Sequence, residues 1–199
     1  MSIVVFGVLF LAQTRPVFDP AEIAAQKVLD PIGGSLEWVA PDARESKDEW
    51  VLCLDVENKA RSFDVSLVKP LKRLYALRVL GGRVLEKSLK TLAELPRLGL
   101  LVITGEGVSD KGLQIIAQCQ GISKLDVAGQ KISASGLLKV SKMTSLRRVF
   151  FYNTRLTDAD LEPLKTMTFL DQLVVPETVS QGALQRLAKS LPHTQIERM

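Results

Sequence analysis

Apolar residues recur every 24 residues through most of this 199-residue chain, and no other feature restricts the possible folds as strongly. The first recurring position is occupied by Leu74, Leu98, Ile122, Leu146 and Leu170. Two later positions of the same units are also apolar: Leu77, Leu101, Leu125, Val149 and Leu173, then Val79, Ile103, Val127, Phe151 and Val175. A fixed period of about 20 to 50 residues is typical of proteins built by stacking one structural unit.

Each unit contains two kinds of spacing. The first part alternates apolar and other residues, which predicts a strand. The second part spaces apolar residues three or four apart, as in Leu89, Leu92 and Leu95, which predicts a helix. One unit cannot bury its own apolar face, so we expect units to stack, with a parallel sheet on the concave side. The predicted fold class is therefore α/β, a solenoid of strand–helix units.

Residues suited to helix starts and tight bends lie between the strand and helix parts. Ser109, Ser133 and Thr157 carry hydroxyl groups that can cap free backbone N–H groups. Asp110 and Asp158 place negative charge near the positive end of the following helix. The residues suited to the bend after the strand are Gly81, Gly82, Gly105, Gly107, Gly129 and Asn153.

The chain divides into an apolar segment at residues 1–15, an N-terminal cap at 16–50, and about six repeat units at 51–199. In the cap, Asp19 and Pro20 favour a helix start. The apolar stripe of that helix is Ala25, Val28, Leu29 and Ile32. Short strands are expected at 35–39 and 50–56, and we expect this helix and β-hairpin to cover the open end of the stack.

The run Ile3 to Ala12 contains ten apolar or small residues. A membrane-spanning helix needs about 20, so we expect no transmembrane span. The length suits the apolar region of a signal peptide, which favours an exported or cell-envelope location over the cytoplasm. However, no basic residue precedes the run, and Phe10 stands where a small residue is expected before a cleavage point. The alternatives are an extension packed on the protein body or a start codon placed too early.

Two segments resemble the I-T-D-x-G-L element of leucine-rich-repeat (LRR) proteins: V-S-D-K-G-L at 108–113 and L-T-D-A-D-L at 156–161. The strict 24-residue period is similar to that of bacterial tandem LRR proteins with T-[IV]-T-D-x-G-L units. The stretch from Gly112 to Cys119 is more distantly similar to the LRR part of F-box/LRR ubiquitin-ligase adaptors. The resemblance covers about 51–199 and implies a right-handed LRR solenoid whose concave sheet binds a protein partner.

The candidate partner site consists of strand residues that point away from the core. Arg148, Phe150 and Tyr152 form one row on the concave face, and Arg78, Lys124 and Asp126 are expected nearby. Arginine and aromatic residues dominate the energetics of protein interfaces. We therefore predict that an unknown protein binds here; the alternative is that the aromatic residues only stabilise cross-strand packing.

The charge distribution suggests a second hypothesis. Residues 16–64 contain 11 acidic and 5 basic residues, whereas 65–199 contain 11 acidic and 20 basic. A nucleic-acid or other anionic partner would use the basic residues of 69–97, which are Lys69, Lys72, Arg73, Arg83, Lys87, Lys90 and Arg97. Most of these are expected on helices or turns, so nucleic-acid binding is the less favoured reading. A structural role in the cell envelope is a further alternative.

The sequence contains no recognised catalytic motif, and we expect no enzyme activity and no cofactor. Cys53, Cys119 and His193 do not have the spacing of zinc ligands, so no metal site is expected. Cys119 falls on a helical core position and is expected to be a buried apolar residue.

Overall fold

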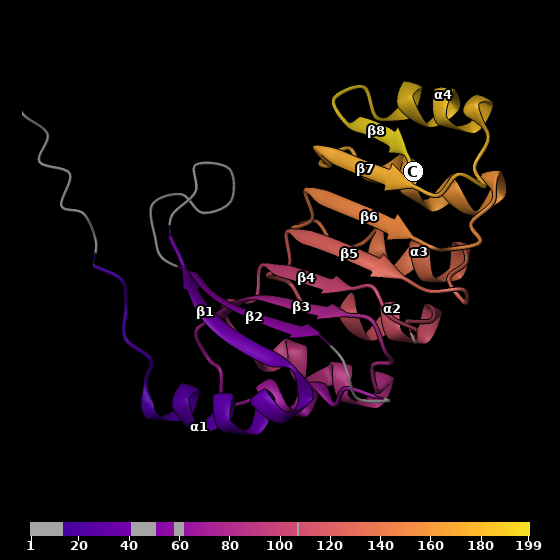
Figure 1. Ribbon diagram of the computed structural model, residues 1–199. Helices are drawn as coiled ribbons and strands as arrows, with labels where there is room; N and C mark the ends of the chain where they lie inside the picture. The colour runs from indigo at the N-terminus through magenta and orange to yellow at the C-terminus, as the bar shows by residue number, and fades with distance from the viewer. Residues whose placement is uncertain (1–13, 41–50, 58–61, 107) are drawn as a thin grey trace, which may run out of the picture.

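The computed structural model describes residues 14–40, 51–57, 62–106 and 108–199 (Figure 1). The strands are β1 (Gly34–Val39), β2 (Val51–Glu57), β3 (Leu74–Leu80), β4 (Leu100–Ile103), β5 (Lys124–Ala128), β6 (Arg148–Tyr152), β7 (Gln172–Val175) and β8 (Gln195–Arg198). The α-helices are α1 (Pro20–Leu29), α2 (Asp110–Ile116), α3 (Ala134–Val140) and α4 (Gln181–Ser190). The 3-10 helices are η1 (Asp30–Ile32), η2 (Val65–Val68), η3 (Glu86–Glu94) and η4 (Asp158–Thr166).

The strands form one eight-stranded sheet in chain order from β1 to β8. β1 pairs antiparallel with β2, and every later pair is parallel. Between β3 and β7 the paired residues lie 24 positions apart, as in Leu77 with Leu101 and Leu125 with Val149. Figure 1 shows the strands stacked in one layer, with α2 and α3 on the opposite side of each unit. The fold is an α/β solenoid of the leucine-rich-repeat type.

The core lies between the sheet and the helices and consists of the recurring apolar positions. Leu77, Leu101, Leu125, Val149 and Leu173 are all fully buried, one per unit. Burial of an aliphatic side chain of this size contributes about 1.5 to 3 kcal/mol. Cys119 is buried on the helical side of the same core, as its position in the repeat predicts.

The helical parts of the units are of two kinds. α2 and α3 are α-helices, whereas η2, η3 and η4 are 3-10 helices. In η4 a local cause is Pro163, because its missing N–H and its ring disfavour an α-helical ladder. A 3-10 helix is more tightly wound than an α-helix. η3 and η4 contain nine residues each, whereas α2 and α3 contain seven.

Conformations that favour glycine or asparagine occur at the bend after two of the strands. Gly81, Gly82 and Asn153 have φ angles of 74°, 64° and 44°. Gly105 is required for a different reason, because a Cβ atom there would collide with the backbone oxygens of Gly81 and Gly82. The bends predicted at these residues are confirmed, and Gly107 lies outside the described residues.

A ladder of carboxylate–hydroxyl contacts joins successive units at the helix starts. In each contact a carboxylate of one unit accepts hydrogen bonds from the backbone N–H and the hydroxyl of a serine in the next, at 2.5 to 2.8 Å. The pairs are Glu86 with Ser109, Asp110 with Ser133, and Asp158 with Ser180. Ser109 and Ser133 also accept backbone N–H groups of their own helices, so the caps predicted at these two residues are confirmed. The caps thus stabilise the stack as well as the helix.

The ladder changes where the repeat places Ala134, which has no carboxylate. Thr157, the hydroxyl residue of the following unit, instead donates from its N–H and its Oγ1 to Asp160, at 2.8 and 2.7 Å. The other oxygen of Asp160 accepts the N–H of Ala134 at 3.0 Å. Asp160 therefore joins the same two units from the opposite direction.

The helix α1 turns its acidic residue inward. Glu22 is 1% exposed and accepts hydrogen bonds from Arg73 at 2.8 and 2.6 Å. The Arg73 guanidinium also lies 4.9 Å from the ring of Trp38. The predicted apolar stripe is wrong at Val28, which is 54% exposed, because the face toward the repeats contains Glu22, Ala25 and Leu29 instead.

The outer edge of β1 is partly closed by a side chain. The Gln26 amide accepts the backbone N–H of Leu36 at 2.7 Å and donates to the carbonyl of Gly34 at 3.0 Å. Unused backbone groups at a sheet edge can pair with another strand, so these two bonds protect the edge.

Among the described residues, no helix is long and apolar enough to cross a membrane. The apolar run Ile3 to Ala12 and the first residue of the strand predicted at 50–56 lie outside the described residues.

The buried contact between Glu22 and Arg73 gives a first prediction. Arg73→Met leaves a carboxylate buried without its cation, which we expect to lower the free energy of unfolding by on the order of 3 kcal/mol. Urea unfolding followed by circular dichroism measures the change. The double variant Glu22→Gln/Arg73→Met should lose less, because no buried charge remains. A loss of less than about 0.5 kcal/mol in the single variant would contradict this account.

The carboxylate ladder gives a prediction about acid. Hydrogen bonds from the side chain and the backbone of Ser180 lower the pKa of Asp158. A lowered pKa in the folded state contributes stability above the ordinary value, about 3.9, and this stability is lost as the pH falls through the folded value. We expect Asp158→Asn to be less stable than the native protein at pH 6, with the difference shrinking below about pH 4 and vanishing once the pH has fallen below the folded-state pKa of Asp158. Thermal unfolding from pH 2 to pH 7 tests this, with Asp171→Asn as the control. A difference that stays constant down to pH 2 would refute it.

Candidate functional site on the strand face

We use the term concave face for the side of the sheet that points away from the helices. Its side chains lie in rows that cross the strands. One row contains Cys53, Ala76, Leu100, Lys124, Arg148, Gln172 and Gln195. The next contains Asp55, Arg78, Val102, Asp126, Phe150, Val174 and Glu197.

Five of the six predicted site residues come together on β5 and β6. Lys124 is paired in the sheet with Arg148, and Asp126 with Phe150. Tyr152 ends β6, paired with Ala128. All are half-buried, so each is held by its neighbours while part of its surface is accessible.

Arg78 belongs to a separate cluster at the other end of the face. Its Nε atom lies 2.5 Å from Asp55, and its guanidinium lies 3.8 Å from Glu37 of β1. Arg78 therefore ties β1 to β2 and β3, and its charge is already neutralised. The sequence did not reveal this role because Glu37 and Asp55 reach Arg78 only through the register of the cap strands.

The centre of the candidate site is a pair of stacked rings. The centroids of Phe150 and Tyr152 lie 5.9 Å apart, with 10° between the ring planes. The Arg148 guanidinium lies 5.5 Å from the Phe150 centroid, and its Nε donates to Oε1 of Gln172 at 3.0 Å. Such ring contacts contribute about 0.5 to 1.5 kcal/mol each, which favours this arrangement of the three side chains.

Tyr152 keeps its phenolic proton at neutral pH. Burial raises the pKa of Tyr152, the nearby Asp126 carboxylate raises it further, and Arg148 has the opposite effect. The site therefore offers a rigid apolar surface with a guanidinium at one end and a hydroxyl group at the other.

The floor of the face differs from expectation. Ala76, Val102, Ala128 and Val174 point away from the helices, but each is buried, with exposed fractions of 1 to 8%. These side chains are small, and larger residues surround them in the rows. The accessible surface of the face consequently consists of fewer, larger side chains than the alternation alone predicts.

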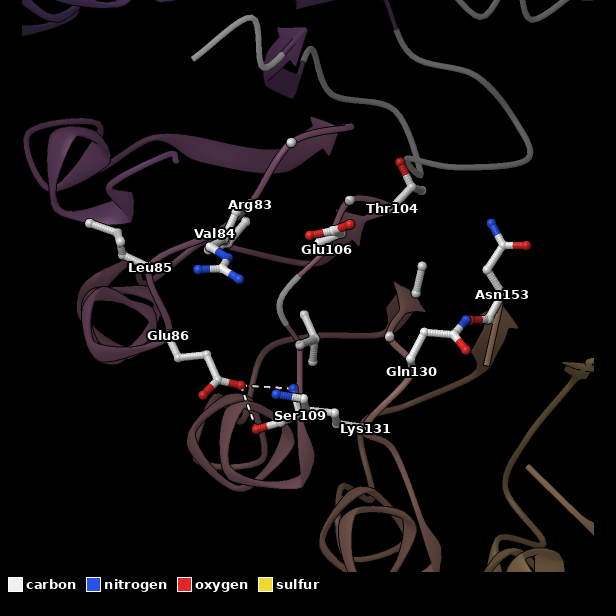
Figure 2. A pocket seen from close by; sticks show the side chains of 15 residues that line it. Arg83, Val84, Leu85, Glu86, Thr104, Glu106, Ser109, Gln130, Lys131 and Asn153 are labelled. Carbon is white, nitrogen blue, oxygen red and sulfur yellow. Dashed lines mark hydrogen bonds between the residues drawn. The ribbon is translucent and has the colours of Figure 1, made fainter. Parts of the chain in front are cut away.

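A hollow lies at the carboxyl ends of the strands, where the turns leave the sheet (Figure 2). Its volume is about 1280 Å³, and its polar lining includes Arg83, Glu86, Glu106, Ser109, Gln130, Lys131 and Asn153. The contact between Glu86 and Ser109 drawn in Figure 2 belongs to the ladder that joins the units. Gln130 donates to the backbone oxygen of Asn153. These lining groups are thus partly engaged in holding the turns.

Metal-ligating side chains do not gather in the described part of the chain. Within that part, no cluster of three or more His, Cys, Asp or Glu side chains fits a metal ion. Burial raises the pKa of the Cys119 thiol to about 11, so this group is a poor nucleophile near neutral pH.

No protein-family model and no curated protein matches this chain. A solved structure that does match in fold is an internalin (inlF) of Listeria monocytogenes, with a TM-score of 0.53 and 21% identity. The match covers 67% of this chain and 37% of the internalin, so this chain spans little more than a third of that protein. At this identity the likeness shows the fold alone, and it supports the leucine-rich-repeat architecture.

Another match is the LRR ectodomain of the receptor kinase SOBIR1 from Arabidopsis thaliana. It is 11% identical, and the match covers 91% of this chain and 92% of that one, with a TM-score of 0.36. This likeness is too distant to support an argument about the site.

Proposed function

We propose that the protein binds another protein through the concave face, with Arg148, Phe150 and Tyr152 at the centre of the interface. The observation that carries this proposal is the half-exposed stack of Phe150 and Tyr152, with the Arg148 guanidinium beside it. Rigid aromatic side chains and arginine lose little conformational freedom on binding and are frequent interface hot spots.

The size of the sheet suits this function. A specific protein interface buries about 1,600 Å² in total, or about 800 Å² on each partner. The parallel strands β2 to β8 present a continuous surface of alternating side chains across the units. We also propose the finer features that the resemblance implies: a right-handed coil of the bacterial tandem type, a cap at 16–50, and repeats at 51–199.

Binding of an anion through residues 69–97 has less support. Lys69 pairs with Glu94 at 3.0 Å, and Lys72 donates to the Glu94 backbone oxygen at 3.2 Å. Arg73 is held by Glu22. These three basic groups are thus already engaged by groups of the same chain, which favours the concave face as the partner site.

The proposal predicts that Phe150→Ala/Tyr152→Ala removes partner binding while the protein stays folded. Affinity purification with mass spectrometry, comparing native and variant baits, should show at least a tenfold loss of the specifically captured protein, equivalent to about 1.4 kcal/mol. The matched control is Leu138→Ala, which removes an exposed apolar side chain on the helix side. Equal capture by a double variant with a native circular dichroism spectrum would exclude this face as the partner site.

A further inference from the structure

Arg78 and Arg148 both project from the concave face, but their charges are satisfied differently. Arg78 contacts two carboxylates of this chain, Asp55 and Glu37. Arg148 donates its Nε to the neutral amide of Gln172 and rests against the ring of Phe150. Among the described residues, Arg148 forms no ion pair. Arg148 is therefore a half-buried cation whose fixed contacts are all with neutral groups.

The contacts of Arg148 leave its binding atoms available. The bond to Gln172 uses Nε, and the ring contact uses the flat face of the guanidinium. The two terminal nitrogens can then donate two parallel hydrogen bonds to a carboxylate, which is the geometry that arginine favours. Because the guanidinium is already held on two sides, little side-chain freedom is lost when a carboxylate binds.

We propose that the partner presents a carboxylate to Arg148, next to an apolar side chain that packs on Phe150 and Tyr152. This inference rests on the proposed function, because it names the chemistry recognised at the same face. The occupant is an acidic segment of a protein, in which an aspartate, a glutamate or a terminal carboxylate lies beside an apolar residue.

The neighbouring charges determine where the carboxylate lies. Lys124 is paired with Arg148 across the sheet, so two cationic side chains share one row. Asp126 is paired with Phe150 in the next row, about 7 Å further along the strands. The negative charge thus belongs in the row of Arg148, and the apolar side chain belongs over the rings.

Matched small probes test the carboxylate directly. Sodium 3-phenylpropanoate carries a ring and a carboxylate, and 3-phenylpropanamide is its uncharged counterpart. We expect titration of the isotope-labelled full chain, followed by NMR, to show saturable shifts of the Arg148 side-chain Nε–H signal and the β6 amides with the acid. The amide probe should bind at least tenfold more weakly. Equal binding of the two probes would overturn the proposal.

Three variants identify the group responsible. Arg148→Gln should weaken acid binding at least tenfold and leave binding of the amide probe unchanged. Arg148→Lys should give a smaller loss, because it keeps the charge but not the paired donors. Lys142→Gln, a charge removal at an exposed position after α3, should have no effect. Thermal unfolding of each variant establishes that it is folded, and a folded Arg148→Gln variant that binds the acid normally would refute the proposal.

A phage-displayed random heptapeptide library extends the test to segments of a protein. Selection on the native protein should enrich Asp or Glu beside an apolar residue, and selection on Arg148→Gln should lose the acidic preference. Stronger displacement of the acid probe by inorganic phosphate than by acetate would replace the carboxylate with a phosphate and overturn the proposal. The outcome is separable from that of the proposed function. If Phe150→Ala/Tyr152→Ala abolishes protein capture while both probes bind the native protein equally, the proposed interface is supported and recognition of a carboxylate by Arg148 is refuted.

Discussion

The fold depends on a mismatch in width between the two halves of each repeat. Parallel strands lie about 4.8 Å apart, whereas α-helices with their side chains are about 10 Å wide. Stacking a strand and a helix from every unit therefore curves the stack, with the strands on the inner side. On the outer side the helical parts are of two kinds, because η2, η3 and η4 are wound more tightly than α2 and α3. The candidate site occupies the inner surface that this mismatch produces.

Polar contacts between neighbouring units hold this stack in register. The carboxylates of Glu86, Asp110 and Asp158 reach the next unit, and Asp160 reaches back where the repeat has Ala134. At the amino-terminal end, Arg73 ties α1 to the repeats. Because each contact crosses from one unit to the next, the strands cannot slide without losing hydrogen bonds. These contacts add to the strand pairing that sets the relative positions of β5 and β6.

The sequence predicted those parts of the structure that depend on period. Leu101 and its equivalents point inward because alternation in a strand is independent of distant contacts. The same alternation placed Phe150 and Tyr152 on one face, although their stacking was not predicted. The right-handed coil and the domain division remain predictions.

Features that depend on residues far apart in the chain were not predicted. Val28 was assigned to a buried stripe, but Glu22 is the residue that faces inward. It does so because it binds Arg73, which lies 51 residues further along the chain. Asp110 was assigned to the helix dipole, but it also binds Ser133 of the next unit. In the candidate site, the neutralisation of Arg78 depends on the antiparallel register of β1, which no local pattern encodes.

The Gln26 side chain has a consequence for how copies of this protein behave at high concentration. By bonding to Gly34 and Leu36 it takes the place of a neighbouring strand, with one donor and one acceptor arranged like a peptide group. A sheet that ended there with open backbone groups would be a template for further strands, and such templates lead to aggregation. One amide side chain, contributed by α1, therefore makes the first edge of the sheet a poor starting point for fibre growth.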